Sequence, residues 1–266
     1  MSEMGKKGKS PFSLFSLPHF PQMRRIIIFL LTFLFIVSWL PSVHASGYYT
    51  VNLLVAHDEE WDYIASRRYA YSGETLAMII IADAFYYFYQ SFSITYRIVA
   101  YKNWDSDDSV TNKDVMFDEV VAETGFYSGM TIAGNRVDVL IAFSDQETIG
   151  AYGLADSTLG VVLVMETYLS GVGQATENVL QHELSHLYGS LDEYQNGHLC
   201  VMNNYPYWIG FPYYYYVPTA LVTNTWCSTA TNIIQSNRGA WGRDTNSIGG
   251  GCGGTVWWLA RWMMAW

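Results

Sequence analysis

Residues 181–192 read QHELSHLYGSLD, and the interpretation of the whole chain starts from this stretch. His182 and His186 are four residues apart, so on a helix their imidazoles lie one turn apart on one face and can bind one cation. Glu183 lies one step around the helix, where its carboxylate reaches a water on that cation rather than the cation itself. An adjacent apolar face, which we expect to pack on a sheet, consists of Leu180, Leu184 and Leu187. The stretch therefore predicts a helix with a core side and a metal side, as a zinc hydrolase requires.

A turn after this helix is expected to supply the third ligand. No glutamate follows residue 193, so a glutamate from a later helix is excluded. Asp192 lies six residues past His186, and Gly189 between them allows the chain to turn because glycine adopts left-handed angles without a Cβ penalty. We therefore predict a Zn²⁺ site, with a fourth position open to water, formed by His182, His186 and Asp192. Two alternatives for the third ligand remain, His198 and, less favoured, Asp244.

The same residues resemble the zinc-binding motif of the metzincin peptidases. The chain reads His182-Glu183-x-x-His186-x-x-Gly189-x-x-Asp192, the snapalysin-like variant in which aspartate replaces the third histidine. Residues 200–203, CVMN, resemble the methionine turn of that family, with Met202 as its methionine. The resemblance implies an α/β (α+β) fold with a twisted, mixed and mostly parallel sheet, an active-site helix and an irregular C-terminal subdomain. The aspartate makes this an atypical member.

The resemblance also implies an activity, that of a zinc-dependent endopeptidase. Zinc would activate a water for attack on the peptide bond, with Glu183 as the general base. Tyr194, two residues past Asp192, could donate a hydrogen bond to the tetrahedral intermediate, although it could equally be a packed loop tyrosine. The alternative function is that of an exported, non-catalytic binding module on the same scaffold, with a structural metal. Glu183 favours the enzyme, because a structural site has no use for a general base.

Strands and helices are expected to alternate in a catalytic domain spanning residues 46–246. Apolar and β-branched runs predict strands at 49–56, 93–101, 137–143 and 160–165, and an irregular edge strand at 149–157. Helical spacing predicts helices at 72–90, 112–124 and 176–188. This order predicts a largely parallel sheet. The edge segment 150–156 is a candidate for binding an extended peptide by strand addition. After Gly189 the regular pattern fades, so the remainder is expected to be irregular.

The N-terminal 45 residues have the layout of a secretory signal peptide. Residues 26–40 read IIIFLLTFLFIVSWL, preceded by Arg24 and Arg25 and followed by the small-residue pattern of residues 43–45. A permanent membrane span needs about 20 apolar residues, and this run is shorter. We therefore expect a secreted, extracellular protein. The alternative is an uncleaved N-terminal anchor, which would be the protein's contact with a membrane.

Composition restricts the partners. The chain has 14 Lys+Arg against 24 Asp+Glu, a net charge of −10, and so offers no basic stripe for nucleic acid. Half of its residues are hydrophobic and 14% are charged, which argues against disorder. The expected partner is a protein or peptide substrate, and the composition does not fix the oligomeric state.

The sequence leaves three features undecided. Two of the three cysteines, Cys200, Cys227 and Cys252, could pair in an oxidising compartment, and the sequence does not select the pair. The aromatic stretch 204–218 is expected to be a loop that packs over the sheet, with a wall of the substrate cleft as the alternative. Residues 247–266 form a glycine-rich joint and an apolar tail, 255–266, which is too short to span a bilayer.

Overall fold

The computed structural model describes residues 48–146, 152–169, 173–209 and 215–244. The predicted signal peptide and the C-terminal tail therefore lie outside the described residues. Within the described part of the chain, no helix is both long enough and apolar enough to cross a membrane.

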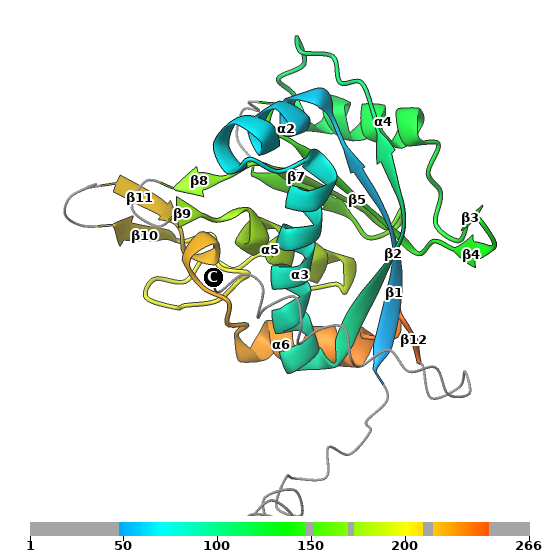
Figure 1. Ribbon diagram of the computed structural model, residues 1–266. Coiled ribbons are helices and arrows are strands. Elements are labelled where there is room, and N and C mark those ends of the chain that lie inside the picture. Colours follow the sequence, from blue (N-terminus) through cyan, green and yellow to red (C-terminus); the bar gives the residue numbers. More distant parts are fainter. Residues whose placement is uncertain (1–47, 147–151, 170–172, 210–214, 245–266) are drawn as a thin grey trace, which may run out of the picture. The chain divides into compact units, whose positions relative to one another are not determined.

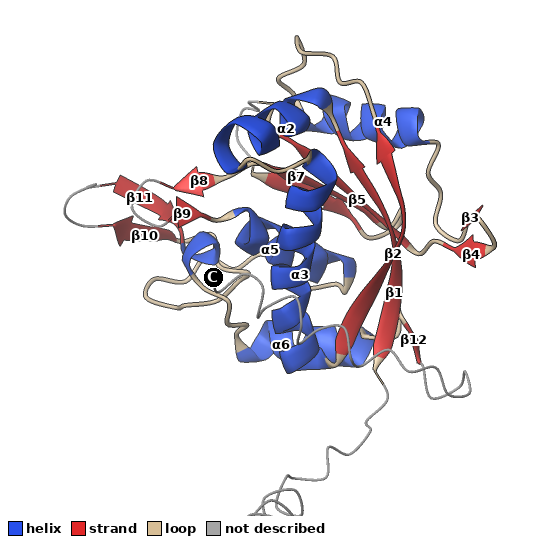
Figure 2. Ribbon diagram, in the orientation of Figure 1, coloured by secondary structure: helices blue, strands red, loops and turns tan. Residues whose placement is uncertain are grey.

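A six-stranded, mostly parallel sheet forms the centre of the domain (Figures 1 and 2). Its order is β12-β1-β5-β7-β6, with β2 beside β1. The strands that run parallel to one another are β1 (Tyr49–His57), β2 (Ile94–Asn103), β5 (Val139–Ser144) and β7 (Val161–Met165). The edge strand β6 (Gly153–Asp156) is antiparallel to β7, and the short β12 (Arg243–Asp244) is antiparallel to β1. The sheet is thus mixed, as the order of elements predicts.

Helices cover both faces of this sheet (Figure 2). On one face lie α3 (Gly73–Phe92) and α5 (Thr176–Leu187), and on the other lies α4 (Lys113–Thr124). Alternation along β1 separates the two cores, because successive side chains of a strand point to opposite faces. Leu53 and Val55 join the core under α3 and α5, whereas Leu54 joins the core under α4. The predicted α/β class is confirmed, and the architecture is consistent with a metzincin-like fold.

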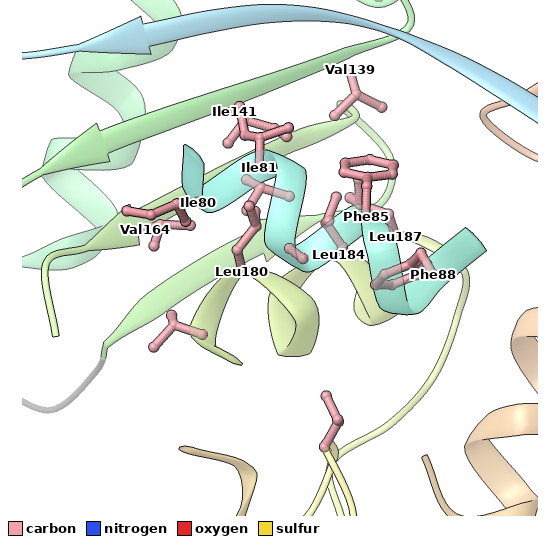
Figure 3. Close-up of a cluster of buried hydrophobic side chains, with 14 of the residues drawn as sticks. Ile80, Ile81, Phe85, Phe88, Val139, Ile141, Val164, Leu180, Leu184 and Leu187 are labelled. Atoms are coloured by element: carbon pink, nitrogen blue, oxygen red, sulfur yellow. The ribbon is translucent and has the colours of Figure 1, made fainter. Parts of the chain in front are cut away.

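The apolar face of α5 packs where the sequence predicts. Leu180, Leu184 and Leu187 are at most 4% exposed. Figure 3 shows them beside Phe85 and Phe88 of α3 and near Ile141 and Val164 of the sheet. Each fully buried leucine stabilises the fold by about 1.5–3 kcal/mol. Because this face of α5 is held against the core, the orientation of the opposite face, which carries the two histidines, is set.

The ends of the predicted helices follow local capping. The Ser72 side chain accepts a hydrogen bond from the Thr75 N–H at 3.2 Å and so begins α3. Asn112 begins α4 in the same way, through the Asp114 N–H at 2.8 Å. After α4, Gly125 adopts a left-handed conformation with φ of 61°.

Several elements differ from the prediction. The polar segment after β1 is helical: Asp58 caps α2 (Glu59–Ile64), which continues into a π-helical turn, η1 (Ala65–Tyr69). These helices bury Trp61 and Ala65, too little to give a periodic pattern. In the part expected to be irregular lie the 3-10 turn η2 (Thr219–Val222) and α6 (Ser228–Asn237), which buries Ala230 and Ile234.

Two-stranded hairpins account for the remaining elements. The aromatic stretch 204–218, expected to be a loop, contains the antiparallel pair β10 (Pro206–Ile209) and β11 (Tyr215–Pro218). That expectation is wrong because two runs rich in β-forming tyrosine and tryptophan lie on either side of residues 210–214. The other pairs are β3 (Thr131–Ile132) with β4 (Asn135–Arg136), and β8 (Tyr168–Leu169) with β9 (Gly173–Gln174).

Candidate metal centre

The helix α5 carries both histidines and the glutamate into one cleft. The cleft has a volume of about 730 Å³, and its lining includes His182, Glu183 and His186. His182 is 8% exposed and Glu183 7% exposed, so both lie at the bottom rather than at the rim. The Nε2 atoms of the two histidines are 3.2 Å apart. The i, i+4 spacing thus produces the convergence expected of it.

The turn after α5 brings Asp192 to this pair. Gly189 is left-handed, with φ of 86°. The Ser190 N–H donates to Ser185 O at 3.1 Å and the Gly189 N–H donates to His186 O at 2.9 Å, the two bonds of a Schellman motif. The chain then reverses, and Asp192 Oδ1 lies 3.1 Å from His182 Nε2 and 3.4 Å from His186 Nε2. The same oxygen accepts a hydrogen bond from Asn204 Nδ2 at 3.0 Å.

Main-chain carbonyls orient both imidazoles. His182 Nδ1 lies 2.8 Å from Val201 O, and His186 Nδ1 lies 2.7 Å from Ser190 O. A carbonyl can only accept, so each Nδ1 donates its proton, and in the neutral form of either ring Nε2 carries a lone pair. Two lone pairs and a carboxylate oxygen that face one another require a proton or a cation between them.

The three ligand atoms match the dimensions of a zinc site. Bonds of 2.0–2.1 Å at a tetrahedral angle place neighbouring ligand atoms about 3.3 Å apart. The distances among His182 Nε2, His186 Nε2 and Asp192 Oδ1 are 3.1, 3.2 and 3.4 Å. Two imidazoles and a carboxylate that leave one position open are the donor set of a catalytic rather than a closed structural site. The residues present therefore fit Zn²⁺.

The surroundings of the two carboxylates in the cleft shift their pKa values in opposite directions. Hydrogen bonds that the protonated rings of His182 and then His186 donate hold the pKa of Asp192 well below its usual range. Burial raises the pKa of Glu183, although the two histidines oppose this effect. Burial would lower the pKa of His186, but Asp192 and Glu183 more than offset this and raise it. The anionic form is thus favoured at Asp192, whereas burial disfavours it at Glu183.

Gly153 of the edge strand lies against the Glu183 side chain. A Cβ placed on Gly153 would come within 2.7 Å of Glu183 Cγ and 2.9 Å of Glu183 Oε1. The strand β6 and the helix α5 are therefore in contact at Glu183. Along with Gly153, the cleft lining includes Leu154 and Ala155 of the same strand and Lys113 at the start of α4.

The segment that resembles a methionine turn lies directly behind the histidines. The Asn203 N–H donates to Cys200 O at 2.9 Å, which closes a four-residue turn. Met202 is fully buried, and Val201 supplies the carbonyl that orients His182. The Glu193 N–H donates to Met202 O at 2.7 Å, so the turn is hydrogen-bonded to the residue next to Asp192.

The remaining predicted residues lie in different places. Tyr194 lines the cleft and is 70% exposed. His198 Nδ1 lies 3.1 Å from Glu193 Oε2 and is not part of the group formed by the two helix histidines and Asp192. Asp244 lies in β12, where its backbone pairs with Tyr49. Among the described residues, Asp192 is thus the one brought to His182 and His186.

Sequence reasoning missed the groups that support the site. Val201 and Ser190 act through main-chain carbonyls, which carry no side-chain signal in a sequence. Asn204 and Gly153 act through contacts between segments. The one available signal was the glycine in the middle of the predicted edge strand, because glycine within a strand often marks a close approach by another group.

Comparisons with known proteins leave the function to be argued from the site. No family model matches the chain, and a comparison with curated proteins finds no match. A solved chaperone–substrate complex is similar with a TM-score of 0.45 and 14% identity. The match covers 72% of this chain and 38% of that chain. A zinc-dependent peptidase from Methanocorpusculum labreanum is similar with a TM-score of 0.40 and 11% identity, covering 68% of this chain and 99% of its own. Likenesses this loose carry no functional argument.

Proposed function

We propose that this protein is an exported, zinc-dependent endopeptidase of the metzincin type. One observation carries the proposal: His182 Nε2, His186 Nε2 and Asp192 Oδ1 converge at 3.1–3.4 Å, with Glu183 beside them in the same cleft. The donor set leaves a ligand position open, and a buried carboxylate adjoins it. A closed structural site would need neither. Export is inferred from the layout of residues 1–45.

The chain's own residues have distinct roles in peptide hydrolysis. His182, His186 and Asp192 would hold a zinc ion, which lowers the pKa of water to about 7 and polarises the scissile carbonyl when bound. Glu183 accepts the proton of the attacking water and passes it to the leaving nitrogen, a role suited to a carboxyl whose pKa burial has raised. Val201 O and Ser190 O keep the two imidazoles in the tautomer that binds a metal.

The edge strand gives the cleft a means of binding a peptide. β6 pairs with β7 along one side and ends the strand order of the sheet. Gly153, Leu154 and Ala155 of this strand line the cleft that holds Glu183. An extended peptide that adds to β6 by main-chain hydrogen bonds would lie across Glu183 and the metal ligands. The substrate is therefore expected to bind as an extended segment of a protein or peptide.

The test is hydrolysis of a general protein substrate such as casein. The wild-type chain should cleave it, a chelator should abolish cleavage, and added zinc should restore it. Glu183→Gln should retain zinc, measured by metal analysis, but lose hydrolysis by at least about 100-fold. Glu74→Gln, at an exposed carboxylate on α3, is the matched control and should be fully active.

Two results would contradict the proposal. Turnover retained by Glu183→Gln would remove its role as the base. A zinc-loaded wild-type chain that cleaves nothing in a broad peptide library would instead favour the non-catalytic binding module.

A further inference from the structure

A second group of metal-ligating side chains lies behind the candidate catalytic site. It consists of Glu193, Cys200 and Cys227, which come from three separate segments. Glu193 follows Asp192, Cys200 begins the four-residue turn containing Met202, and Cys227 is the N-cap of α6. Cys200 is fully buried, Cys227 is 6% exposed, and the Glu193 side chain is 14% exposed. Three chain segments thus direct ligand-type atoms into the interior at one point.

The distances within the group suit a cation. The two sulfurs and a Glu193 carboxylate oxygen all lie within 4.8 Å of one another. Glu193 Oε1 is 3.0 Å from Cys227 Sγ. Bonds of about 2.3 Å to sulfur and 2.0–2.2 Å to oxygen at tetrahedral angles place such atoms about 3.5–3.8 Å apart. Small side-chain movements therefore bring all three atoms to coordinating distance.

A backbone N–H lies beside one sulfur of this group and an imidazole beside its carboxylate, as expected around thiolate metal ligands. The Cys227 N–H points at Cys200 Sγ, at 3.1 Å, where it would stabilise negative charge on that sulfur. His198 Nδ1 lies 3.1 Å from Glu193 Oε2, so it can orient the carboxylate or supply a fourth ligand. A disulfide between the cysteines would account for the two sulfurs, but it gives no reason for the Glu193 carboxylate to approach them.

We propose that Cys200, Cys227 and Glu193 bind a second, structural metal ion of the zinc class, with His198 as the fourth ligand or the support of Glu193. Two thiolates select a borderline-soft ion such as Zn²⁺ over Ca²⁺ or Mg²⁺, which prefer oxygen ligands. Both cysteines are buried, which suits a closed structural site.

This ion would fix the parts of the chain that carry the first site. Cys200 O closes the turn that presents Val201 O to His182. The Val201 N–H in turn donates to Thr225 O at 2.9 Å, two residues before Cys227. Glu193 is adjacent to Asp192. A metal that links Cys200 and Cys227 to Glu193 therefore joins α6 to both sides of the catalytic metal centre.

Metal counting on the full chain tests the proposal independently of peptidase activity. Protein loaded with Zn²⁺ alone under reducing conditions should hold two zinc ions per chain. Cys200→Ser with Cys227→Ser should hold one, and so should His182→Ala with His186→Ala. The matched control, Cys252→Ser, should hold two. Loading with Co²⁺ should give a thiolate-to-cobalt charge-transfer band that the Cys200/Cys227 variant lacks and the histidine variant keeps.

A measurement on the wild-type chain covers the case in which the cysteine variant fails to fold. An organomercurial that modifies thiols should release one of the two zinc ions to a chromophoric chelator. The proposal is overturned if the wild-type chain binds one zinc ion that thiol modification does not release. It is also overturned if the purified protein has a mass two hydrogens lower and yields a disulfide-linked peptide joining Cys200 to Cys227.

Discussion

Replacing Gly153 by alanine tests how the edge strand positions the proposed general base. The new Cβ would lie 2.7 Å from Glu183 Cγ and 3.0 Å from Leu163 O, whereas ordinary contacts begin at about 3.4 Å. The carbonyl belongs to the backbone of β7, which is buried and paired on both sides, so it shifts less readily than the Glu183 side chain. The Glu183 side chain must therefore move by about 0.7 Å or more.

The expected effect is on catalysis rather than on metal binding. A misplacement of about 1 Å at a catalytic group can lower the rate by about 100-fold. We therefore expect Gly153→Ala to lower kcat/KM for peptide hydrolysis by about 10- to 100-fold. Zinc content should stay at the wild-type value, because the three atoms nearest the new methyl group belong to Glu183 and Leu163 rather than to the proposed ligands. Overpacking should also lower the free energy of unfolding by about 1–3 kcal/mol.

A glycine outside the cleft supplies the control. A Cβ on Gly239 would meet an atom of the Tyr49 ring at 3.3 Å, and neither residue is part of the cleft lining. Gly239→Ala should keep kcat/KM within about twofold. If Gly153→Ala is as active as the control while Glu183→Gln is inactive, Glu183 is the base but the contact with β6 does not position it. That result would refute the reasoning.

Two further predictions concern a ligand and a buried acid. Asp192→Ala should lower zinc affinity at the first site by at least about 100-fold in metal analysis, and unchanged affinity would transfer the third-ligand role to another residue. Burial raises the pKa of Asp58 from 3.8 to about 7, so its ionised form destabilises the fold as the pH rises through that range. Asp58→Asn should therefore unfold like the wild type near pH 4 but gain up to about 4 kcal/mol above pH 8 in denaturant titrations; equal stability at both pH values would contradict the assignment.

Most of the central sheet and its three long helices could be predicted from the sequence. The strands β5 and β7 are continuous apolar runs and β1 is largely one, because helices cover both faces of each. β2 buries Ile94 alone and could be predicted from its alternating pattern instead. α3 and α4 carry recognisable caps at Ser72 and Asn112. In contrast, α2 and α6 could not be predicted because each is short and buries one or two side chains. Their helical conformation depends on packing against elements distant in the sequence.

In the candidate site, too, the features that are local in the sequence could be predicted and the others could not. The spacing of His182, Glu183 and His186 is local to one helix, and the turn at Gly189 is local to its end, so both follow from the sequence. The choice of Asp192 over His198 is less local. It depends on the path of the chain after Gly189, and there His198 turns to Glu193 instead.

Both proposed metal centres depend on the return of the chain after α5. An α-helix can present two ligands four residues apart, but a third ligand must come from a different direction, so the chain has to turn back sharply. Residues 190–205 make that return, and few regular elements hold them in place. Among the bonds that do so are those of Glu193 with Met202 and of Asn203 with Gln195 and His198. A second ion at Cys200, Cys227 and Glu193 would stabilise this return where it passes under His182. The loss of that ion should therefore weaken zinc binding at the first site, even though the two sites share no ligand.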